Sequence, residues 1–194
     1  MKKKRGDSNL NEVDPIREIE KIRVISDYLK QKKQRNYIMF RIGIYTGLRI
    51  SDILKLKVRD VKKKNKIRNR MILREMKTGK ERKIAINKAL KKDLKAYCHT
   101  KPDGEYLIKS REETNKPISR DMAYKIMKDI KERFDLESCG THTLRKTFGY
   151  HYYKKTKDIA TLRKLFNHGD SSITLRYIGI TQNTLDGAIL GMEY

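Results

Sequence analysis

The sequence predicts a mainly helical α+β domain that carries a small antiparallel three-stranded sheet. Apolar residues recur at helical spacing near both ends of the chain, whereas short β-type segments with turn residues between them occupy its middle. No stretch rich in Pro, Gly or Ser divides the 194 residues into equal parts. One main domain is therefore expected.

The first third of the chain is expected to form three helices. Asp14 is predicted to be the N-cap of the first helix and Pro15 its first residue. The apolar positions that follow at helical spacing are Ile16, Ile19, Ile22, Ile25 and Leu29. Residues 37–45 are apolar nearly all round, which indicates a buried helix that ends at Gly47. A short helix over residues 51–56 then places Arg49 at a helix junction.

The three predicted strands lie over residues 58–61, 71–76 and 83–86. The turn residues 78–80 (Thr-Gly-Lys) join the last two strands. After the sheet, the sequence predicts a helix marked by Leu90, Leu94 and Tyr97, followed by a short extended piece over residues 106–108.

The second half of the chain is predicted to be helical throughout. Ser119, Thr141 and Asp158 are the expected N-caps of three helices. Their inward positions are Met122, Ile126, Ile130 and Phe134 in the first, Leu144, Phe148 and Tyr152 in the second, and Ile159, Leu162, Leu165 and Phe166 in the third.

The end of the chain contains a predicted tight corner. Asn167 and Gly169 flank His168, and both residue types tolerate the left-handed backbone of a helix terminus. Ser171 or Ser172 is expected to cap a final segment that contains Tyr177. The apolar positions beyond it are Leu185, Ile189 and Met192.

The charge of the chain indicates a polyanionic partner. Lys and Arg total 48 against 24 acidic residues, giving a formal net charge of +24 that is spread over the predicted elements. Charge alone does not separate DNA from RNA, so a ribosomal-type RNA binder stays open, as does a basic surface without a partner. A membrane is not favoured, because no apolar run approaches the roughly 20 residues of a bilayer span.

The cysteines and the basic start of the chain point to a reducing cytoplasm. Cys98 and Cys139 are too few for a disulfide framework and lack metal-ligand spacing, so reduced core thiols are expected. The opening sequence MKKKRGDSN lacks the apolar region of a secretory signal.

Four segments resemble the catalytic domain of the tyrosine recombinase (phage integrase) family, in the family's order and near its spacing. They are TGLRISDILKLKVRDV (46–61), MKTGKERKIAIN (76–87), THTLRKTFGYHYY (141–153) and LRKLFNHGDSSITLRYIGI (162–180). Asn167 departs from the family's usual glycine, but it also adopts left-handed geometry.

The resemblance implies three parts. Residues 1–13 are expected to be a flexible basic tail, 14–180 the catalytic domain, and 181–194 a C-terminal helix or tail. In the family this last segment packs into a neighbouring protomer, and docking on its own domain is the alternative. Family members usually carry a helical core-binding domain upstream, so the chain is either a single-domain member or a fragment.

The resemblance also implies a catalytic set without metal or cofactor: Arg49, Lys77, His142, Arg145, His168 and Tyr177. Two guanidinium groups would hold the scissile phosphate, the histidines would donate hydrogen bonds or carry protons, and Lys77 would protonate the leaving oxygen. Tyr177 would attack phosphorus, giving a 3′-phosphotyrosyl link and a free 5′ hydroxyl. Asp52 matches an acidic position expected to hold Arg49.

Each of these residues also has a structural interpretation. Arg49 could be a surface or capping arginine, and Arg145 a nucleic-acid contact without catalysis. A lone histidine often serves as a helix cap. Any turn of this lysine-rich chain is expected to contain a lysine, as at Lys77, and Lys80 is the alternative general acid. The ordinary interpretation of Tyr177 is a core tyrosine. The other tyrosines considered, Tyr150, Tyr152, Tyr153 and Tyr194, lack the family's interval after a motif histidine.

The function implied is a DNA strand transferase: a site-specific recombinase or integrase that integrates or excises a mobile element or phage. The alternatives are a type IB topoisomerase-like relaxing activity and a non-cleaving DNA-binding accessory protein of the same fold. The implied partners are double-stranded DNA, further copies of the chain in a dimer or tetramer on DNA, and accessory DNA-bending or directionality proteins.

Overall fold

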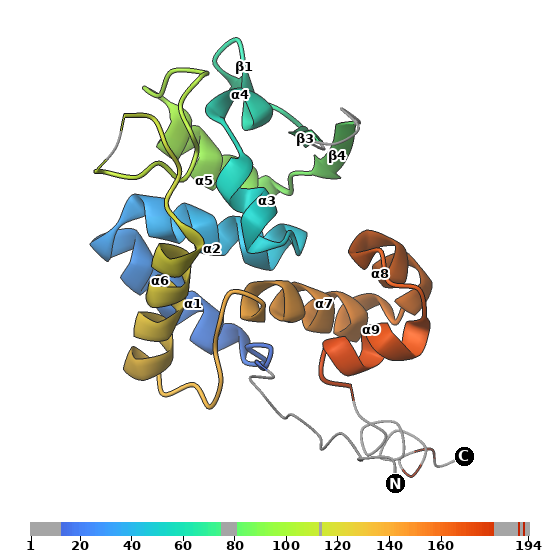
Figure 1. Ribbon diagram of the computed structural model, residues 1–194. Helices are drawn as coiled ribbons and strands as arrows, with labels where there is room; N and C mark the ends of the chain where they lie inside the picture. Colours follow the sequence, from blue (N-terminus) through green and yellow to red (C-terminus); the bar gives the residue numbers. More distant parts are fainter. Residues whose placement is uncertain (1–12, 75–80, 113, 181–189, 191, 193–194) are drawn as a thin grey trace, which may run out of the picture.

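The structure, a computed structural model, describes residues 13–74, 81–112, 114–180, 190 and 192 (Figure 1). Its helices are α1 (Ile19–Lys32), α2 (Gln34–Thr46), α3 (Ile50–Lys55), α4 (Val58–Val61), α5 (Lys88–Cys98), α6 (Arg120–Arg133), α7 (Thr143–Thr156), α8 (Ile159–Phe166) and α9 (Ser171–Tyr177). Its strands are β1 (Lys62–Lys63), β2 (Lys66–Ile67), β3 (Arg70–Arg74) and β4 (Glu81–Ala85). The prediction of a mainly helical domain is confirmed.

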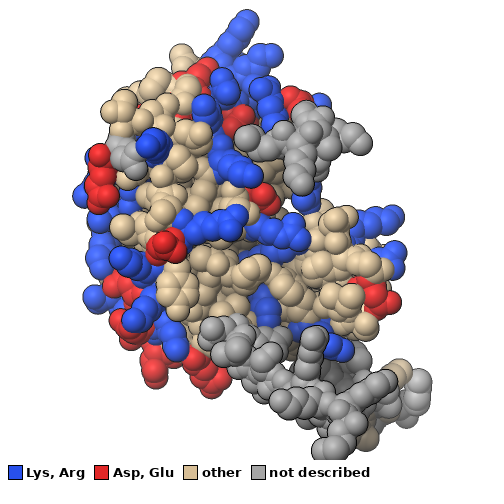
Figure 2. All heavy atoms as spheres, viewed as in Figure 1, with Lys and Arg blue, Asp and Glu red and all other residues tan. Residues whose placement is uncertain are grey.

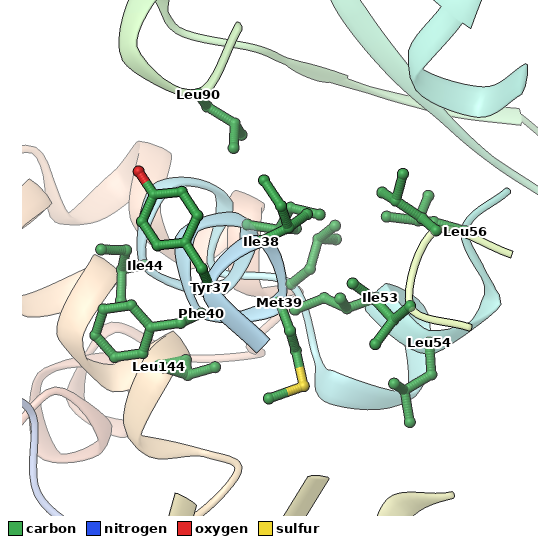
Figure 3. Packing of buried hydrophobic residues seen from close by; sticks show 14 of the residues in the cluster. Tyr37, Ile38, Met39, Phe40, Ile44, Ile53, Leu54, Leu56, Leu90 and Leu144 are labelled. Carbon is green, nitrogen blue, oxygen red and sulfur yellow. The ribbon is translucent and has the colours of Figure 1, made fainter. Parts of the chain in front are cut away.

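Helix α2 is the centre of the fold, because it contacts α1, α3, α5 and α7. Ile38, Met39, Phe40 and Ile42 point in different directions from the helix axis, and all four are fully buried. Figure 3 shows Phe40 beside Leu144 of α7. The all-round apolar sequence therefore makes a buried helix, as predicted.

The end of α2 is also as predicted. Gly47 adopts the left-handed conformation with φ of 64°, and its backbone N–H donates to the carbonyl oxygen of Gly43. Because a side chain is disfavoured at this φ, glycine lets the chain turn sharply from α2 into α3. Arg49, the N-cap residue of α3, thus lies at the predicted helix junction.

The first helix begins later than predicted, at Ile19, with Glu18 as its N-cap residue. Asp14 is not a helix cap: its N–H donates to Ser138 Oγ at 2.8 Å, and its carboxylate accepts from the same hydroxyl at 2.9 Å. The N–H of Ile16 donates to Thr147 Oγ1 at 2.9 Å. These bonds to distant residues hold residues 14–16 outside the helix.

The predicted three-stranded sheet is wrong: the described residues form two separate two-stranded antiparallel sheets, β1 with β2 and β3 with β4. Residues 58–61 form helix α4 rather than a strand. Val58 and Val61 are both fully buried, which the three-residue spacing of one helix face allows. Asp60 reinforces the helix start, because its carboxylate accepts from the N–H of Lys57 at 2.7 Å.

The other strand predictions are confirmed with shifted ends. Strands β3 and β4 pair from Arg70 opposite Ala85 to Arg74 opposite Glu81. The predicted turn at 78–80 lies outside the described residues. The extended piece predicted at 106–108 reduces to one antiparallel bridge between Tyr106 and Lys57.

Helices α5, α6 and α8 agree with the sequence. Ser119 Oγ accepts from the N–H of Met122 at 3.0 Å, and Asp158 accepts from Thr161 at 2.9 Å, so both predicted caps are present. Asn167 ends α8 in the left-handed conformation with φ of 53°.

Two further predicted caps are wrong. The N-cap residue of α7 is His142 rather than Thr141, and Thr143 Oγ1 instead accepts from the N–H of Gly140 at 3.0 Å. The cap of α9 is Asp170, whose carboxylate accepts from the N–H of Ser172 at 2.6 Å. Ser171 and Ser172 are the first two residues of the helix rather than its cap.

The apolar interior has two parts. The larger cluster surrounds α2, and the smaller one is built on Leu162, Phe166 and Ile178, between α7, α8 and α9. Figure 1 shows α7 extending from the side of α2 toward α8 and α9, so this helix connects the two clusters.

Three sequence predictions are left: reduced core thiols, the apolar positions near the C-terminus, and no apolar run long enough to span a bilayer. Cys98 and Cys139 are buried free thiols, as expected, and burial raises the pKa of each to about 11. Leu185 and Ile189 lie outside the described residues, while Met192 is exposed. Among the described helices, none has the length and apolar character needed to cross a bilayer.

Replacing Gly47 with alanine should destabilise the fold by about 2 to 4 kcal/mol, through left-handed strain and overpacking. A Cβ atom at Gly47 would lie 2.5 Å from Cδ1 of Phe148 and 3.0 Å from Cε1 of Phe166. Urea unfolding measures the loss. Gly104→Ala is the control, since its Cβ would meet no atom within 4 Å. Equal stability of the two variants would contradict the proposed strain.

Candidate active site

Arg145 is a buried cation at the start of α7 that connects two other helix ends. One terminal nitrogen, Nη1, donates to the carbonyl oxygen of Gly47 at 2.5 Å, and Nη2 donates to that of Phe166 at 2.8 Å. Its guanidinium carbon lies 4.0 Å from the centre of the Phe166 ring. The side chain therefore fixes the C-terminal ends of α2 and α8 beside the start of α7.

The pKa of Arg145 falls to about 10, mainly because of burial, with further lowering by Arg49 and Arg82. Tyr177 and Asp52 act in the opposite direction. The group is still protonated at neutral pH. Asp52 thus bears on Arg145; across the described part of the chain no hydrogen bond or ion pair joins it to Arg49.

Tyr177 is the last residue of α9 and is half-buried. Its hydroxyl lies 3.1 Å from Nδ1 of His142. Its ring meets Phe166 and His168 edge to face, with centroid separations of 5.6 and 5.2 Å. Burial raises the pKa of Tyr177, whereas the charges of Arg145 and Arg49 and a hydrogen bond with Arg145 lower it.

His142 faces this hydroxyl from the N-terminal end of α7. Partial burial lowers the pKa of His142, and the positive charges of Arg145, Arg49 and Lys146 lower it further. A neutral imidazole is therefore the dominant form near pH 7. With its hydrogen on Nε2, such a ring can accept the tyrosine proton at Nδ1.

His168 occupies the corner between α8 and α9. Its Nδ1 lies 3.1 Å from the hydroxyl oxygen of buried Thr174, which in turn donates its one hydrogen to the carbonyl oxygen of Asp170 at 3.2 Å. Nδ1–H of His168 must therefore be the donor, which leaves Nε2 of the neutral ring as an acceptor. Burial, then Arg145 and Arg49, lower the pKa of His168.

Arg49 differs from Arg145 in being exposed. Its charge lowers the pKa of His142, Arg145, His168 and Tyr177, so it lies within electrostatic reach of all four. Within the described ranges its guanidinium makes no hydrogen bond or ion pair. The structure therefore brings five of the six predicted residues together, while Lys77, like its alternative Lys80, lies outside the described residues.

Two further cations border the cluster and were not predicted. Arg82 of β4 donates from Nη2 to the carbonyl oxygen of Leu165 at 2.7 Å, which ties the β3–β4 hairpin to the end of α8. Lys146 is buried, and its Nζ lies 5.4 Å from the centre of the Tyr177 ring. The sequence pointed to them only through their neighbours: Arg82 comes shortly after the predicted turn at 78–80, and Lys146 directly follows Arg145.

The arrangement presents one hydroxyl to a neutral histidine and two guanidinium groups. A phosphodiester bound by the arginines would place an electrophilic phosphorus beside a nucleophile whose proton has an acceptor. No three His, Cys, Asp or Glu side chains of the described residues are grouped as a metal site would require.

Comparisons with known proteins identify relatives of the whole unit. The phage integrase family profile matches residues 16–184. The probable integrase/recombinase YoeC of Bacillus subtilis (strain 168) is 48% identical over 176 residues, which are 91% of this chain and 94% of that protein.

Two crystal structures show the same fold. The XerA recombinase has 19% identity and a TM-score of 0.73, covering 94% of this chain and 68% of that one. The XerH site-specific recombinase bound to its difH substrate has 21% identity and a TM-score of 0.66, covering 93% of this chain and 54% of that one.

Acid should destabilise the folded protein through these histidines. The lowered pKa values mean that the unfolded chain binds protons more readily. The free energy of unfolding should thus be unaffected by these groups above the ordinary histidine pKa of about 6.5, and it should fall as the pH drops below that value. Urea unfolding at about pH 7.5 and about pH 5.5 measures the slope.

The double variant His142→Gln, His168→Gln should lose much of that slope, whereas the exposed His99→Gln should keep it. The depressed pKa values of Asp158 and Asp170 act in a separate window, below about pH 4, because their ordinary value is 3.8. An unchanged slope in the double variant would rule out the histidines as its source.

Proposed function

Because the chain belongs to the phage integrase family, whose members are tyrosine recombinases, we propose that it cleaves and rejoins duplex DNA through a covalent bond between Tyr177 and a 3′ phosphate. The observation that supports this best is the convergence on one hydroxyl. His142 lies 3.1 Å from it, and Arg145 and Arg49 both lower its pKa.

The two arginines would bind the scissile phosphate. A guanidinium has five N–H hydrogens. The carbonyls of Gly47 and Phe166 take two from Arg145, so three are left for the phosphate oxygens and the attacking oxygen of Tyr177. Arg49 is exposed, and its charge acts on the same hydroxyl, so it would supply the second guanidinium. Together they would neutralise the charge that grows in the transition state.

Cleavage then follows in one displacement. The hydroxyl oxygen of Tyr177 attacks phosphorus while its proton passes to Nδ1 of His142. The bond from phosphorus to the 5′ oxygen breaks, and that oxygen takes a proton from Lys77, the proposed general acid. Rejoining is the reverse, with a 5′ hydroxyl attacking the phosphotyrosine. The phosphodiester energy is conserved in the link, so strand exchange needs no nucleotide.

His168 would respond to the bound phosphate. In the free protein its Nε2 holds no hydrogen, since Nδ1 donates to Thr174. A phosphate anion beside the ring favours the protonated form, which can donate from Nε2 as well. The arginines lower the pKa of His168 in the free protein, and the phosphate would offset them.

DNA is the proposed substrate. Figure 2 shows Lys and Arg side chains across the middle of the face drawn, reaching the hollow between the β3–β4 hairpin and α8. The structural likeness to XerH, whose crystal structure contains its difH substrate, supports the same choice. Integration or excision of a mobile element or phage is the proposed role.

Strand exchange needs two cleaved duplexes, so we propose that copies of the chain pair on DNA. The exposed side chains of Leu190 and Met192 support a role for the C-terminal segment in such pairing. Truncation after Ile180 should then weaken assembly on DNA without removing Tyr177.

Tyr177→Phe should abolish a covalent adduct and leave the fold intact. The assay uses nicked duplexes carrying the DNA that flanks the gene, and the adduct is seen on a denaturing gel. Tyr153→Phe, in the same apolar cluster, is the matched control and should form the adduct. An adduct that persists without the Tyr177 hydroxyl would refute the nucleophile. No adduct with any duplex would favour the non-cleaving accessory protein, and relaxation of plasmids without paired sites the topoisomerase-like activity.

Arg49→Ala should slow adduct formation by roughly 10²- to 10³-fold at saturating DNA, the typical cost of losing one transition-state donor. The fold should be unaffected, because Arg49 is exposed. Arg59→Ala removes another exposed arginine, on α4, and should leave the rate unchanged. Equal slowing of both variants would mean that only net charge matters.

A further inference from the structure

A basic groove, which we name the α5 groove, lies between helix α5 and the two hairpins. It encloses about 890 Å³. Among the described residues that line it, seven are Lys or Arg and none is acidic. The cations that carry the argument are Lys66 of β2, Arg70 and Lys83 of the β3–β4 hairpin, and Lys91 and Lys95 of α5.

The α5 groove is on the opposite side of the β3–β4 hairpin from Tyr177. Successive residues of a strand point to opposite faces. Arg82 reaches the carbonyl of Leu165 at the active-site side, so its neighbour Lys83 points the other way, into the groove. Ile72, directly opposite Lys83 in the register, lines the groove as well. DNA held at Tyr177 would therefore not account for these charges.

The groove cations have no carboxylate partner in the described part of the chain. Lys91 donates to Asn69 Oδ1 at 2.7 Å, and Arg68 donates to the carbonyl oxygen of Arg59 at 3.1 Å. So many positive charges around one hollow repel one another, and an anion between them would relieve that repulsion.

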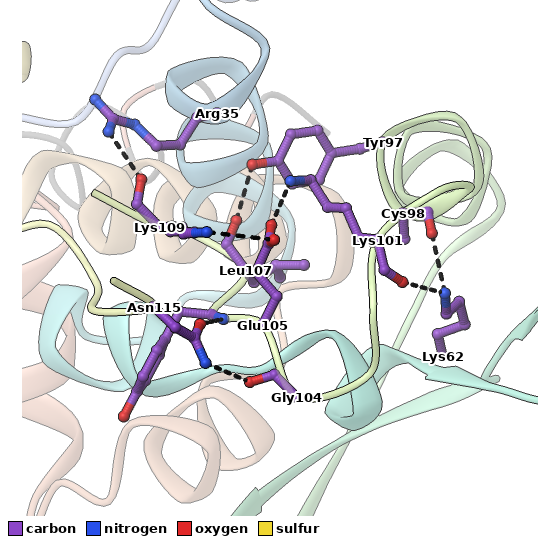
Figure 4. A network of polar contacts seen from close by, with 11 residues as sticks. Arg35, Lys62, Tyr97, Cys98, Lys101, Gly104, Glu105, Leu107, Lys109 and Asn115 are labelled. Atoms are coloured by element: carbon purple, nitrogen blue, oxygen red, sulfur yellow. Dashed lines mark hydrogen bonds and ion pairs between the residues drawn. The ribbon is translucent and has the colours of Figure 1, made fainter. Parts of the chain in front are cut away.

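A second basic hollow, beside Arg35, shows the contrast. There Glu105 pairs with Lys101 at 2.5 Å and with Lys109 at 3.7 Å (Figure 4). Arg35 donates to the carbonyl oxygen of Lys109. Beside that hollow, Lys62 donates to the carbonyl oxygens of Cys98 and Lys101. The second hollow thus contains a carboxylate that pairs with two of its cations, whereas the described lining of the α5 groove contains none.

We propose that the α5 groove binds the phosphate backbone of a second DNA duplex, separate from the segment cleaved at Tyr177. Cations stand on both walls, the hairpins on one side and α5 on the other. The described lining of the groove contains no aromatic residue, which favours backbone contact over the stacking of single-stranded bases. The inference rests on the proposed function only for the identity of DNA as ligand.

Two double variants test the α5 groove. Lys91→Gln with Lys95→Gln removes two groove cations, and Lys88→Gln with Lys92→Gln removes two lysines of the same helix, with the same spacing, that do not line it. Affinity for a long uncleaved duplex is measured against salt. The groove variant should lower the slope of log affinity against log salt by about 1.8, at about 0.9 per lost phosphate contact. Equal slopes for the two variants would overturn the proposal.

Stoichiometry gives an independent measurement. Duplexes of about one helical turn, roughly 10 base pairs, are rigid because the persistence length of DNA is about 150 base pairs, so one duplex cannot bend around the hairpin to both sites. The unmodified chain should bind two of them, and the groove variant should bind the second more weakly. A single duplex on the unmodified chain, or a second duplex bound equally tightly by both proteins, would overturn the proposal. Binding of polyglutamate in the groove in preference to duplex DNA would replace DNA by an acidic protein and also overturn it.

The adduct assay separates this inference from the proposed function. With a short nicked duplex, the groove variant should form the covalent adduct at the unmodified rate, because neither lysine belongs to the catalytic cluster. Failure of every protein to form an adduct would count against the proposed function alone, since the salt slopes and stoichiometry need no cleavage.

Discussion

The buried guanidinium of Arg145 is the interaction on which the rest of the site depends. Burying a cation is costly unless its donors are satisfied. Here the carbonyl oxygens of Gly47 and Phe166 satisfy two of them, at 2.5 and 2.8 Å. Both carbonyls are free for this because each lies at the C-terminal end of a helix, where the last carbonyls lack partners within the helix. One side chain therefore fixes where α2, α7 and α8 meet, and with them Arg49, His142 and His168.

Burial and the positive charges of Arg145 and Arg49 together set the protonation states around Tyr177. Burial first, and then these charges, lower the pKa of His142 and His168, which keeps a proton acceptor beside the hydroxyl. The charges also oppose the effect of burial on Tyr177 itself. Burial alone would make the phenol a poorer nucleophile, since it disfavours the charged phenolate. The half-buried Tyr177 thus depends on the positive charges of Arg145 and Arg49. Arg145 is held in place by the carbonyls of Gly47 and Phe166.

The β3–β4 hairpin has two basic faces with different surroundings. Arg82 connects one face to the end of α8, beside the catalytic cluster, while Lys83 belongs to the other face and the α5 groove. The two residues are adjacent, and they lie on different faces because successive side chains of a strand point to opposite sides. A chain with a net charge of +24 can in this way present more than one surface to DNA.

The sequence by itself determined the local features: the all-round apolar α2, the caps Ser119 and Asp158, the left-handed Gly47 and Asn167, and the motif residues. These signals act over a few positions, so they can be read from neighbouring residues. Tertiary structure decided the later start of α1, since its preceding segment bonds to Ser138 and Thr147. It also decided that 58–61 is a helix, and that His142 meets Tyr177 across 35 positions and Arg145 meets Gly47 across 98. Such contacts depend on how distant elements pack, which no local pattern in the sequence specifies.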